Sequence, residues 1–305
     1  MSVSNSSQSP KPEAGLRWLP VLCILLQNTL YGFGDPISKA AYEVLPVFSL
    51  LSVRYGLALL FLLLAFGRRI LRGLRSCSWQ DWLIPALCMG GAYVTGNIAL
   101  KLSSATSVAF LRSLSTVTTP LLAFVLFRKR IGWRHIPILL LVVLGLYLLC
   151  GVGGLSGFGW GEVLSLFTAL LLSGALIFGE KSVARVDPVT LTAIQTAMSV
   201  AMALICTLLF ENGIHLEAAA GKHWAVIVYL ALACTVTGYF LQNSALTRLS
   251  AQTVALLQCI CPVMTALFSR LLLAEKLTPA GMLGALILLL CAAAETMMTD
   301  DSASG

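Results

Sequence analysis

Residues 93–111 read YVTGNIALKLSSATSVAFL, and residues 239–257 read YFLQNSALTRLSAQTVALL. At a constant offset of 146 the two stretches are identical at nine of nineteen positions, where about two identities would be expected by chance in so apolar a chain. The identical pairs are Tyr93/Tyr239, Asn97/Asn243, Ala99/Ala245, Leu100/Leu246, Ser104/Ser250, Ala105/Ala251, Val108/Val254, Ala109/Ala255 and Leu111/Leu257. We therefore expect two copies of one unit.

The composition indicates an integral membrane protein. Hydrophobic residues make up 58% of the 305 residues and charged residues only 11%, whereas a soluble domain carries about 25% charged residues. Apolar runs of about 20 residues fill most of the chain, and inside a bilayer they must be helices because no water satisfies a lone backbone. The sequence predicts an all-α protein with ten transmembrane helices, at 18–38, 47–67, 81–101, 104–127, 136–151, 162–182, 189–210, 224–245, 250–272 and 278–297.

The net charge of +7 is distributed by membrane side. Basic residues cluster in 68–75, 128–134 and 181–185, which the ten-span reading places on one side together with the N-terminus. Thirteen lysines and arginines lie on that side and five on the other. This bias follows the positive-inside rule, so both termini are expected in the cytoplasm, and it argues against a nucleic-acid partner.

The ends and the cysteines point to no further domain or cofactor. Residues 1–16 are polar and rich in Pro and Ser, and we expect a disordered cytoplasmic segment without a cleaved signal peptide. Residues 298–305 are expected to form a short cytoplasmic tail. The nine cysteines fall mostly in apolar runs and are expected to pack rather than to form disulfides or a metal site.

Each copy has five predicted spans, at 17–151 and 162–297, joined by an outer loop at 152–161. Because five is odd, the second copy enters the membrane inverted. The loops agree with this inversion, because RKRI (128–131) is basic whereas its counterpart AEKL (274–277) has lost most of its positive charge. An inverted repeat in a membrane protein is typical of secondary transporters.

Three stretches resemble a known family: YGFGDPISKAAYEVLPVFSLLSVRYGLALL (31–60), NIALKLSSATSVAFLRSLS (97–115) and AEKLTPAGMLGALILL (274–289). They are similar to EamA-type transporters of the drug/metabolite transporter superfamily, and the resemblance extends from Trp18 to Glu295. It implies ten helices and a central substrate cavity lined by the first four helices of each repeat, with spans five and ten peripheral. Two positions depart from the family pattern, since Tyr31 replaces a usual Trp and Thr116 a usual Pro.

Arg112 is the first candidate for substrate binding. It lies near the middle of the fourth span, where a cation costs roughly 2.5–3.5 kcal/mol on insertion scales. A substrate carboxylate or phosphate, or an ion pair with Asp35, would offset that cost. Gln258 is the repeat counterpart of Arg112, so the two are expected to face one cavity. Thr116 and Thr119 are expected to extend the Arg112 face.

Further polar and aromatic residues lie at membrane depth. Tyr93 and Tyr239 lie too deep for the interfacial belt and are candidates for contact with a ring or an ammonium group, with core packing as the alternative. A polar band in the first span adds Gln27, Asn28 and Tyr31. Asp35, one turn further on, is a candidate for proton coupling, with a solvated carboxylate as the alternative.

Structural roles are expected for five other residues. Asn97 and Asn243 are expected to cap helices or join them, and Arg54, Lys39 and Glu180 are expected to serve structural or interfacial purposes.

These residues favour a secondary transporter in a bacterial cytoplasmic membrane. It would move a small organic metabolite, such as an amino acid or organic acid, by alternating access around a midplane cavity. The family resemblance favours export, with import of a metabolite or a quaternary amine as the alternative. A non-transporting sensor or scaffold is a further alternative. No catalytic constellation is visible. Proton or ion coupling, and a monomer against a homodimer, are left open.

Overall fold

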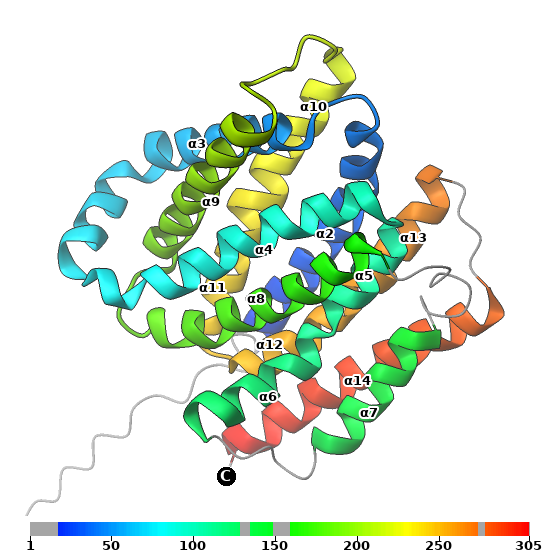
Figure 1. Cartoon of the computed structure of the whole chain (residues 1–305). Helices are drawn as coiled ribbons and strands as arrows, with labels where there is room; N and C mark the ends of the chain where they lie inside the picture. Colours follow the sequence, from blue (N-terminus) through cyan, green and yellow to red (C-terminus); the bar gives the residue numbers. More distant parts are fainter. Residues whose placement is uncertain (1–17, 129–134, 149–158, 274–277, 305) are drawn as a thin grey trace, which may run out of the picture.

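The computed structural model describes residues 18–128, 135–148, 159–273 and 278–304, and all regular elements of this part are helical (Figure 1). The predicted N-terminal segment 1–16 and residues 152–158 of the predicted connecting loop lie outside these residues. The repeats divide the structure into two parts, called here the first half (residues 18–148) and the second half (residues 159–304).

The helices follow the predicted order. The first half contains α2 (Leu19–Tyr42), α3 (Val47–Ser76), the short 3-10 helix η1 (Trp79–Asp81), α4 (Leu83–Leu102), α5 (Ala105–Ser113), α6 (Ser115–Phe127) and α7 (His135–Leu146). The second half contains α8 (Trp160–Ser182), α9 (Pro188–Phe210), α10 (Gly221–Tyr229), the π-helical η3 (Leu230–Thr237), α11 (Gly238–Leu246), α12 (Ala251–Leu257), the 3-10 turn η4 (Gln258–Ile260), α13 (Cys261–Leu273) and α14 (Pro279–Ser304).

Seven helical stretches of the described residues are long and apolar enough to cross a membrane, so the predicted count of ten is not confirmed by length and composition. The other three predicted spans correspond to α2, α7 and α14. Helix α2 has 24 residues but carries Gln27, Asn28, Asp35 and Lys39, which lower its mean hydropathy. Described apolar helix extends only over Ile136–Leu146 in α7 and over Pro279–Ala294 in α14. Helix α14 runs on to Ser304, so most of the predicted C-terminal tail is helical.

One end of the bundle carries the basic clusters 68–75 and 181–185 and is called here the basic end. There Arg69 of α3 pairs with Asp187 before α9 at 2.6 Å, and Arg185 pairs with Asp81 of η1 at 2.9 Å. The Arg185 guanidinium and the backbone N–H of Ser78 hold the pKa of the Asp81 carboxyl below its ordinary value. These contacts join α3 and η1 of the first half to the segment between α8 and α9 of the second half.

Carboxylates tie the loops together at the opposite end. Glu211 after α9 accepts the backbone N–H of Phe48 at 2.9 Å and that of Ser49 at 2.7 Å, at the start of α3. Glu162 in the first turn of α8 accepts the hydroxyl of Ser103 at 2.5 Å. A carboxylate at a helix N-terminus stabilises the orphan N–H groups of the first turn.

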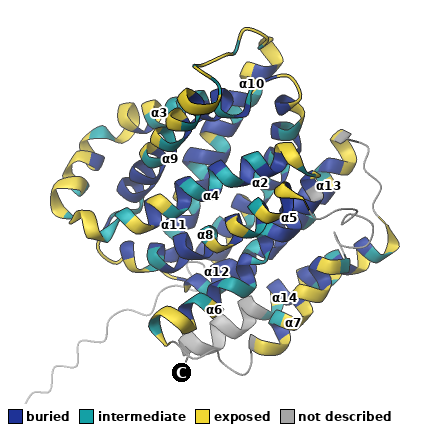
Figure 2. Cartoon of the chain, in the orientation of Figure 1, coloured by how far each residue is buried: buried dark blue, intermediate teal, exposed yellow. Residues whose placement is uncertain are grey.

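The two halves interlock. Helix α4 packs against α8 and α9, α3 packs against α9, and α2 packs against α11 and α13. Helices α7 and α14 pack together at the edge of the bundle, away from α3 and α9 (Figure 1). This agrees with the peripheral position that the resemblance implied for spans five and ten. Figure 2 shows buried residues on the inner faces of the central helices and exposed residues on their outer faces.

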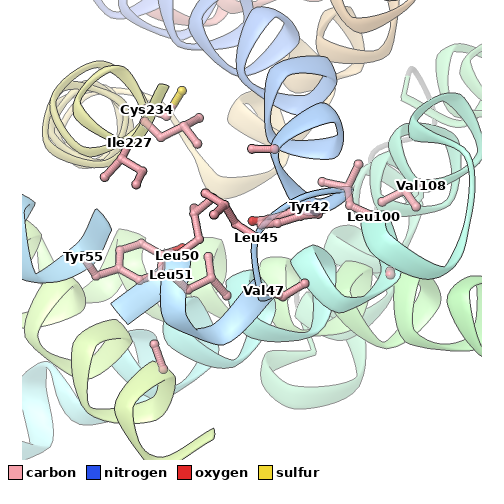
Figure 3. Packing of buried hydrophobic residues seen from close by; sticks show 14 of the residues in the cluster. Tyr42, Leu45, Val47, Leu50, Leu51, Tyr55, Leu100, Val108, Ile227 and Cys234 are labelled. Atoms are coloured by element: carbon pink, nitrogen blue, oxygen red, sulfur yellow. The ribbon is translucent and has the colours of Figure 1, made fainter. Parts of the chain in front are cut away.

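A buried apolar cluster fills the space between α2, α3 and α10, close to the opposite end. Leu45, Leu50, Leu51 and Tyr55 are at most 2% exposed, and Ile227 of α10 packs against them (Figure 3). Lipid tails are as apolar as these side chains, so close packing rather than exclusion from water holds such helices together. The cluster is closely packed and lies beside the polar centre of the bundle.

Candidate functional site

Both halves break a helix at the same repeat position. Helix α5 ends at Ser113 and α6 begins at Ser115, and in the second half α12 ends at Leu257 and is followed by η4. With the offset of 146, residues 112–114 correspond to 258–260. Arg112 and Gln258 therefore lie at equivalent breaks. Helix breaks at membrane depth are tolerated where they border a cavity or other protein, and they expose backbone groups there.

The segments leading to these breaks begin in the same way. The Ser104 hydroxyl accepts the backbone N–H of Ser107 at 3.0 Å and caps α5. The Ser250 hydroxyl accepts the backbone N–H of Thr253 at 3.2 Å and caps α12. Since Ser104 and Ser250 are identical repeat positions, the duplication preserves both the start and the interruption of this helix.

A cavity of about 50 Å³ lies beside the two breaks. Segments of both halves contribute to its wall: α2, α4, α5, α6, α8, α11, η4 and α13. Of the predicted site residues, five line it: Asn28, Tyr31, Tyr93, Arg112 and Gln258. The structure thus brings Arg112 and Gln258 to one cavity, as the repeat predicted.

Three amide side chains meet at one wall of this cavity, and they are called here the amide cluster. Gln242 of α11 accepts with its Oε1 from Gln27 Nε2 at 3.0 Å and from Gln258 Nε2 at 2.9 Å. Gln258 Nε2 also lies 3.1 Å from Gln27 Oε1. Gln27 is fully buried behind the wall, whereas Gln242 and Gln258 line the cavity. The cluster holds α2, α11 and η4 together and presents polar groups to a ligand.

Arg112 forms an ion pair with Asp35. Its Nη2 lies 2.5 Å from Asp35 Oδ2, and its Nη1 lies 3.5 Å from Asp35 Oδ1. The side chains are 17% and 13% exposed, so the pair is largely buried but open on one side. A solvated carboxylate is the alternative role that the sequence predicts for Asp35, and the largely buried ion pair does not agree with that alternative. The ion-pair alternative for Arg112 is confirmed, and Arg112 still lines the cavity.

Three tyrosines stand in a row beside this pair. Tyr31 and Tyr93 meet edge to face with ring centroids 6.1 Å apart, and Tyr93 and Tyr239 are tilted at 5.1 Å. Tyr93 lines the cavity, whereas Tyr239 is fully buried behind it. A β-carbon at Gly238 would lie 2.7 Å from the Tyr31 ring, so glycine at this position makes room for Tyr31.

Three predicted site residues besides Tyr239 do not line the cavity. The Thr116 hydroxyl donates to the Ala255 carbonyl at 2.9 Å, and the Thr119 hydroxyl donates to Ser173 Oγ at 3.0 Å. Their hydroxyls bond to α12 and α8 instead of extending the Arg112 face into the cavity. Gln27 is the third, because its amide is used within the amide cluster.

The residues expected to be structural divide into two groups. Lys39 Nζ donates to the carbonyls of Ser103 and Leu100 at the end of α4, and Glu180 accepts the N–H of Ala251 at 2.9 Å. Asn243 bonds to Thr192 and Gln195. These three join elements, as expected.

Asn97 and Arg54 differ from the expectation. Asn97 accepts the Tyr42 hydroxyl at 2.6 Å, but it also lines the cavity. Arg54 of α3 lines a smaller compartment of about 20 Å³ together with Asp35, Tyr31 and Arg112. Tyr31, Tyr93, Asn97 and Arg112 line both spaces and separate them.

Sequence reasoning missed Gln242, although a signal existed. Its repeat counterpart is Gly96, so a polar residue in one half stands against a residue without a side chain in the other. The same comparison had singled out Arg112 against Gln258. Among the described residues, no group of three or more His, Cys, Asp or Glu side chains could hold a metal ion.

Comparison with known proteins shows the duplication over most of the chain. The model of the EamA-like transporter family matches twice, at residues 18–151 and 159–294. An uncharacterized transporter of Archaeoglobus fulgidus is 26% identical over 298 residues, which cover 95% of this chain and 90% of that protein. A second uncharacterized transporter of the same organism is 27% identical over 215 residues, covering 67% of this chain and 73% of that protein.

A solved crystal structure shares the fold. It superposes with a TM-score of 0.75 at 19% sequence identity, covering 94% of this chain and 98% of that one.

Proposed function

Because the chain belongs to the EamA-like transporter family, and its relatives are named transporters, we propose that this membrane transporter is a secondary transporter of a small organic metabolite with an anionic group. Amino acids and organic acids are the favoured classes, and export is the favoured direction. The transporter works in the bacterial cytoplasmic membrane, with both termini in the cytoplasm. Helices α2, α7 and α14 complete a set of ten spans.

One observation supports this proposal above the others: an arginine and an amide cluster line one cavity beside equivalent helix breaks of two repeats. Transporters built on inverted repeats bind substrate near the membrane midplane, where interrupted helices expose backbone groups. Arg112 supplies a bidentate partner for a carboxylate. Gln242, Gln258 and Asn28 supply neutral groups that can orient the rest of a zwitterion or an organic acid.

The small size of the cavity supports alternating access. About 50 Å³ holds a few water molecules, whereas pockets that enclose a ligand are typically about 300 Å³ or more. Substrate entry therefore requires the halves to move apart. The Asp35–Arg112 pair joins α2 to α5, and a substrate carboxylate competes with Asp35 for the guanidinium. Asp35, once released, is the candidate for proton coupling.

An importer of the same fold would use the same residues. A sensor or scaffold would bind ligand at this cavity without moving it. Transport into sealed vesicles separates a sensor or scaffold from a transporter of either direction, because only a transporter equilibrates solute across the bilayer.

The test is counterflow in proteoliposomes with a panel of amino acids and organic acids. For a solute that the wild type carries, we expect Arg112→Ala to reduce the initial rate at least tenfold, since it removes the only cation that lines the cavity among the described residues. Arg69→Ala is the matched control, because Arg69 is an exposed arginine at the basic end with its own carboxylate partner. A folded Arg112→Ala protein with unchanged rates across the panel would refute the assignment.

A further inference from the structure

Arg54 is a buried cation without an acidic partner. It lies in α3, between Leu51 and Tyr55 of the apolar cluster, and it is 4% exposed. Its Nε donates to the Thr235 hydroxyl at 3.1 Å, and its guanidinium carbon lies 5.1 Å from the centre of the Tyr55 ring. Within the described residues it forms no ion pair.

Neutral partners do not balance a buried charge. A guanidinium carries five N–H donors, and the hydroxyl of Thr235 takes one of them. Thr235 itself donates to the Leu230 carbonyl at 3.0 Å, within the π-helical segment η3. Buried cations are ordinarily paired with an anion or bound to an anionic ligand. Arg54 therefore requires a negative partner that the described side chains do not supply.

The compartment beside Arg54 has the size and charge for that partner. Its volume of about 20 Å³ suffices for one water molecule or one small ion. Two guanidinium groups line it, from Arg54 and Arg112, against a single carboxylate among the described residues, from Asp35. Asp35 is already bonded to Arg112 at 2.5 Å. The net charge of the lining is therefore +1.

Two buried hydroxyl groups beside the compartment lack a well-formed hydrogen bond. Among the described residues, the hydroxyls of Tyr31 and Tyr55 have no partner at hydrogen-bond distance and angle. Their polar neighbours are Gln27 and Tyr93 for Tyr31, and Tyr239 for Tyr55. Tyr31 lines the compartment, and Tyr55 lies next to Arg54 and faces it through its ring. A hydroxyl without a partner is costly when buried, and an anion in this space would accept from it.

We propose that this compartment is an anion subsite, in which Arg54 binds one small monovalent anion with the Tyr31 hydroxyl as a second donor. The anion is either the carboxylate group of the transported solute or a free halide ion. The first assignment rests on the proposed function, whereas the second does not. The Asp35 carboxylate borders the same space and repels an incoming anion, so the Asp35–Arg112 pair must stay intact while the site is filled, because Arg112 then offsets that repulsion.

The experiment measures the thermal midpoint of the purified full-length protein in detergent. Sodium morpholinoethanesulfonate, whose anion is too bulky for the compartment, is replaced stepwise at constant ionic strength by sodium chloride, formate or acetate. A ligand that binds only the folded state raises the midpoint, by about 5 °C at a concentration a hundred times Kd. We expect this rise for the wild type with at least one of the three anions.

The variant Arg54→Met should lose the rise. It should also melt at or above the wild-type midpoint in morpholinoethanesulfonate, because it removes an unbalanced buried charge and keeps the volume. A purely structural Arg54 would instead give a lower midpoint. Arg69→Met, on the same helix but exposed and paired with Asp187, should keep the full rise.

Arg54→Lys covers the case in which Arg54→Met does not fold. Lysine keeps the charge but loses the planar fork, so the anion concentration at half-maximal rise should increase about tenfold. An unchanged concentration would overturn the proposal, as would a wild type whose midpoint does not distinguish any of the three anions from morpholinoethanesulfonate.

The choice of anion identifies the source. A rise with formate or acetate alone indicates the solute carboxylate, and a rise with chloride alone indicates a free halide. If the rise persists while no solute is transported, the subsite stands and the proposed function fails. If solute is transported without any anion-dependent rise in the midpoint, the proposed function stands and the subsite fails.

Discussion

At the scale of single residues, the centre of this protein is defined by charges that lie too deep to be solvated. Arg112 and Asp35 neutralise one another, yet both keep part of their surface open. Leaving one charge of a buried pair without its partner is more costly than removing both. A ligand carboxylate can therefore replace Asp35 as the partner of Arg112, whereas a substitution that removes either side chain leaves the other charge buried and unpaired.

A double-mutant cycle tests this coupling. We expect Asp35→Asn and Arg112→Gln each to lower the thermal midpoint in the absence of solute, because each leaves one buried charge unpaired. The double variant should melt closer to the wild type than either single variant does. The coupling free energy should be about 1–3 kcal/mol. Additive midpoint changes would show that the two side chains act independently, against the geometry of the pair.

The sequence could predict these residues to a limited extent. Arg112 stood out because a cation at membrane depth needs a partner, and the repeat then led to Gln258. The choice between an ion pair and a ligand could not be made, because both satisfy the same charge. The position of Gln242 at the cavity and the burial of Arg54 were not predicted, because the polarity of a residue does not show which neighbours surround it.

At the scale of helices, the predicted fourth span is not fully regular. Residues 112–115 contain neither Gly nor Pro, so no sequence signal marks the end of α5. A continuous helix was therefore expected at 104–127, whereas the structure has a single turn residue, Leu114, between α5 and α6. Seven of the predicted spans correspond to helices long and apolar enough to cross a membrane, because such spans follow from apolar runs.

Close helix approach is a second property of this scale. Gly32 of α2 lies against α13, and a β-carbon there would be 2.3 Å from Met264 Cβ and 2.8 Å from the Met264 backbone carbonyl carbon. No flexible side-chain end can yield at such a contact, so the helices themselves must separate. The same α2 carries Gln27, Asn28 and Asp35, and its position decides the shape of the cavity.

We expect Gly32→Ala to lower the thermal midpoint by several degrees and to weaken solute binding. Gly56→Ala is the matched control, because nothing lies within 4 Å of its β-carbon position in α3 and alanine favours helix there by up to about 1 kcal/mol. Equal midpoints for the two variants would contradict the close contact between α2 and α13.

At the scale of the whole molecule, the two halves are interleaved. Helix α4 lies between α8 and α9 of the other half, and α2 packs against α11 and α13. Each wall of the cavity therefore has contributions from both repeats, and motion of one half against the other must alter it. The duplication was predictable from the offset of 146, and the family model matches the chain twice. The interleaving was not, because an alignment of repeats does not show how the repeats pack.

The two ends of the bundle give the last prediction, which concerns orientation. Helix α3 has 30 residues and is about 45 Å long, against a hydrocarbon thickness of about 30 Å. Its basic last turns, ending near Arg75, should thus project into the cytoplasm. In a variant whose native cysteines are replaced, a membrane-impermeant maleimide should label Arg75→Cys only after permeabilisation. Glu217→Cys, 79% exposed at the opposite end, should be labelled in intact cells.

Labelling in detergent is the control for both positions, since each cysteine must react once the membrane is removed. The reverse pattern would overturn the orientation and leave the bundle intact. Labelling of both positions from the same side would contradict the bundle itself, because Arg75 and Glu217 could not then lie at opposite ends of the membrane-crossing helices. The contacts that join α3 to α9 at both ends place the neighbouring ends of these helices on the same side, so the orientation measured for α3 applies to α9 as well.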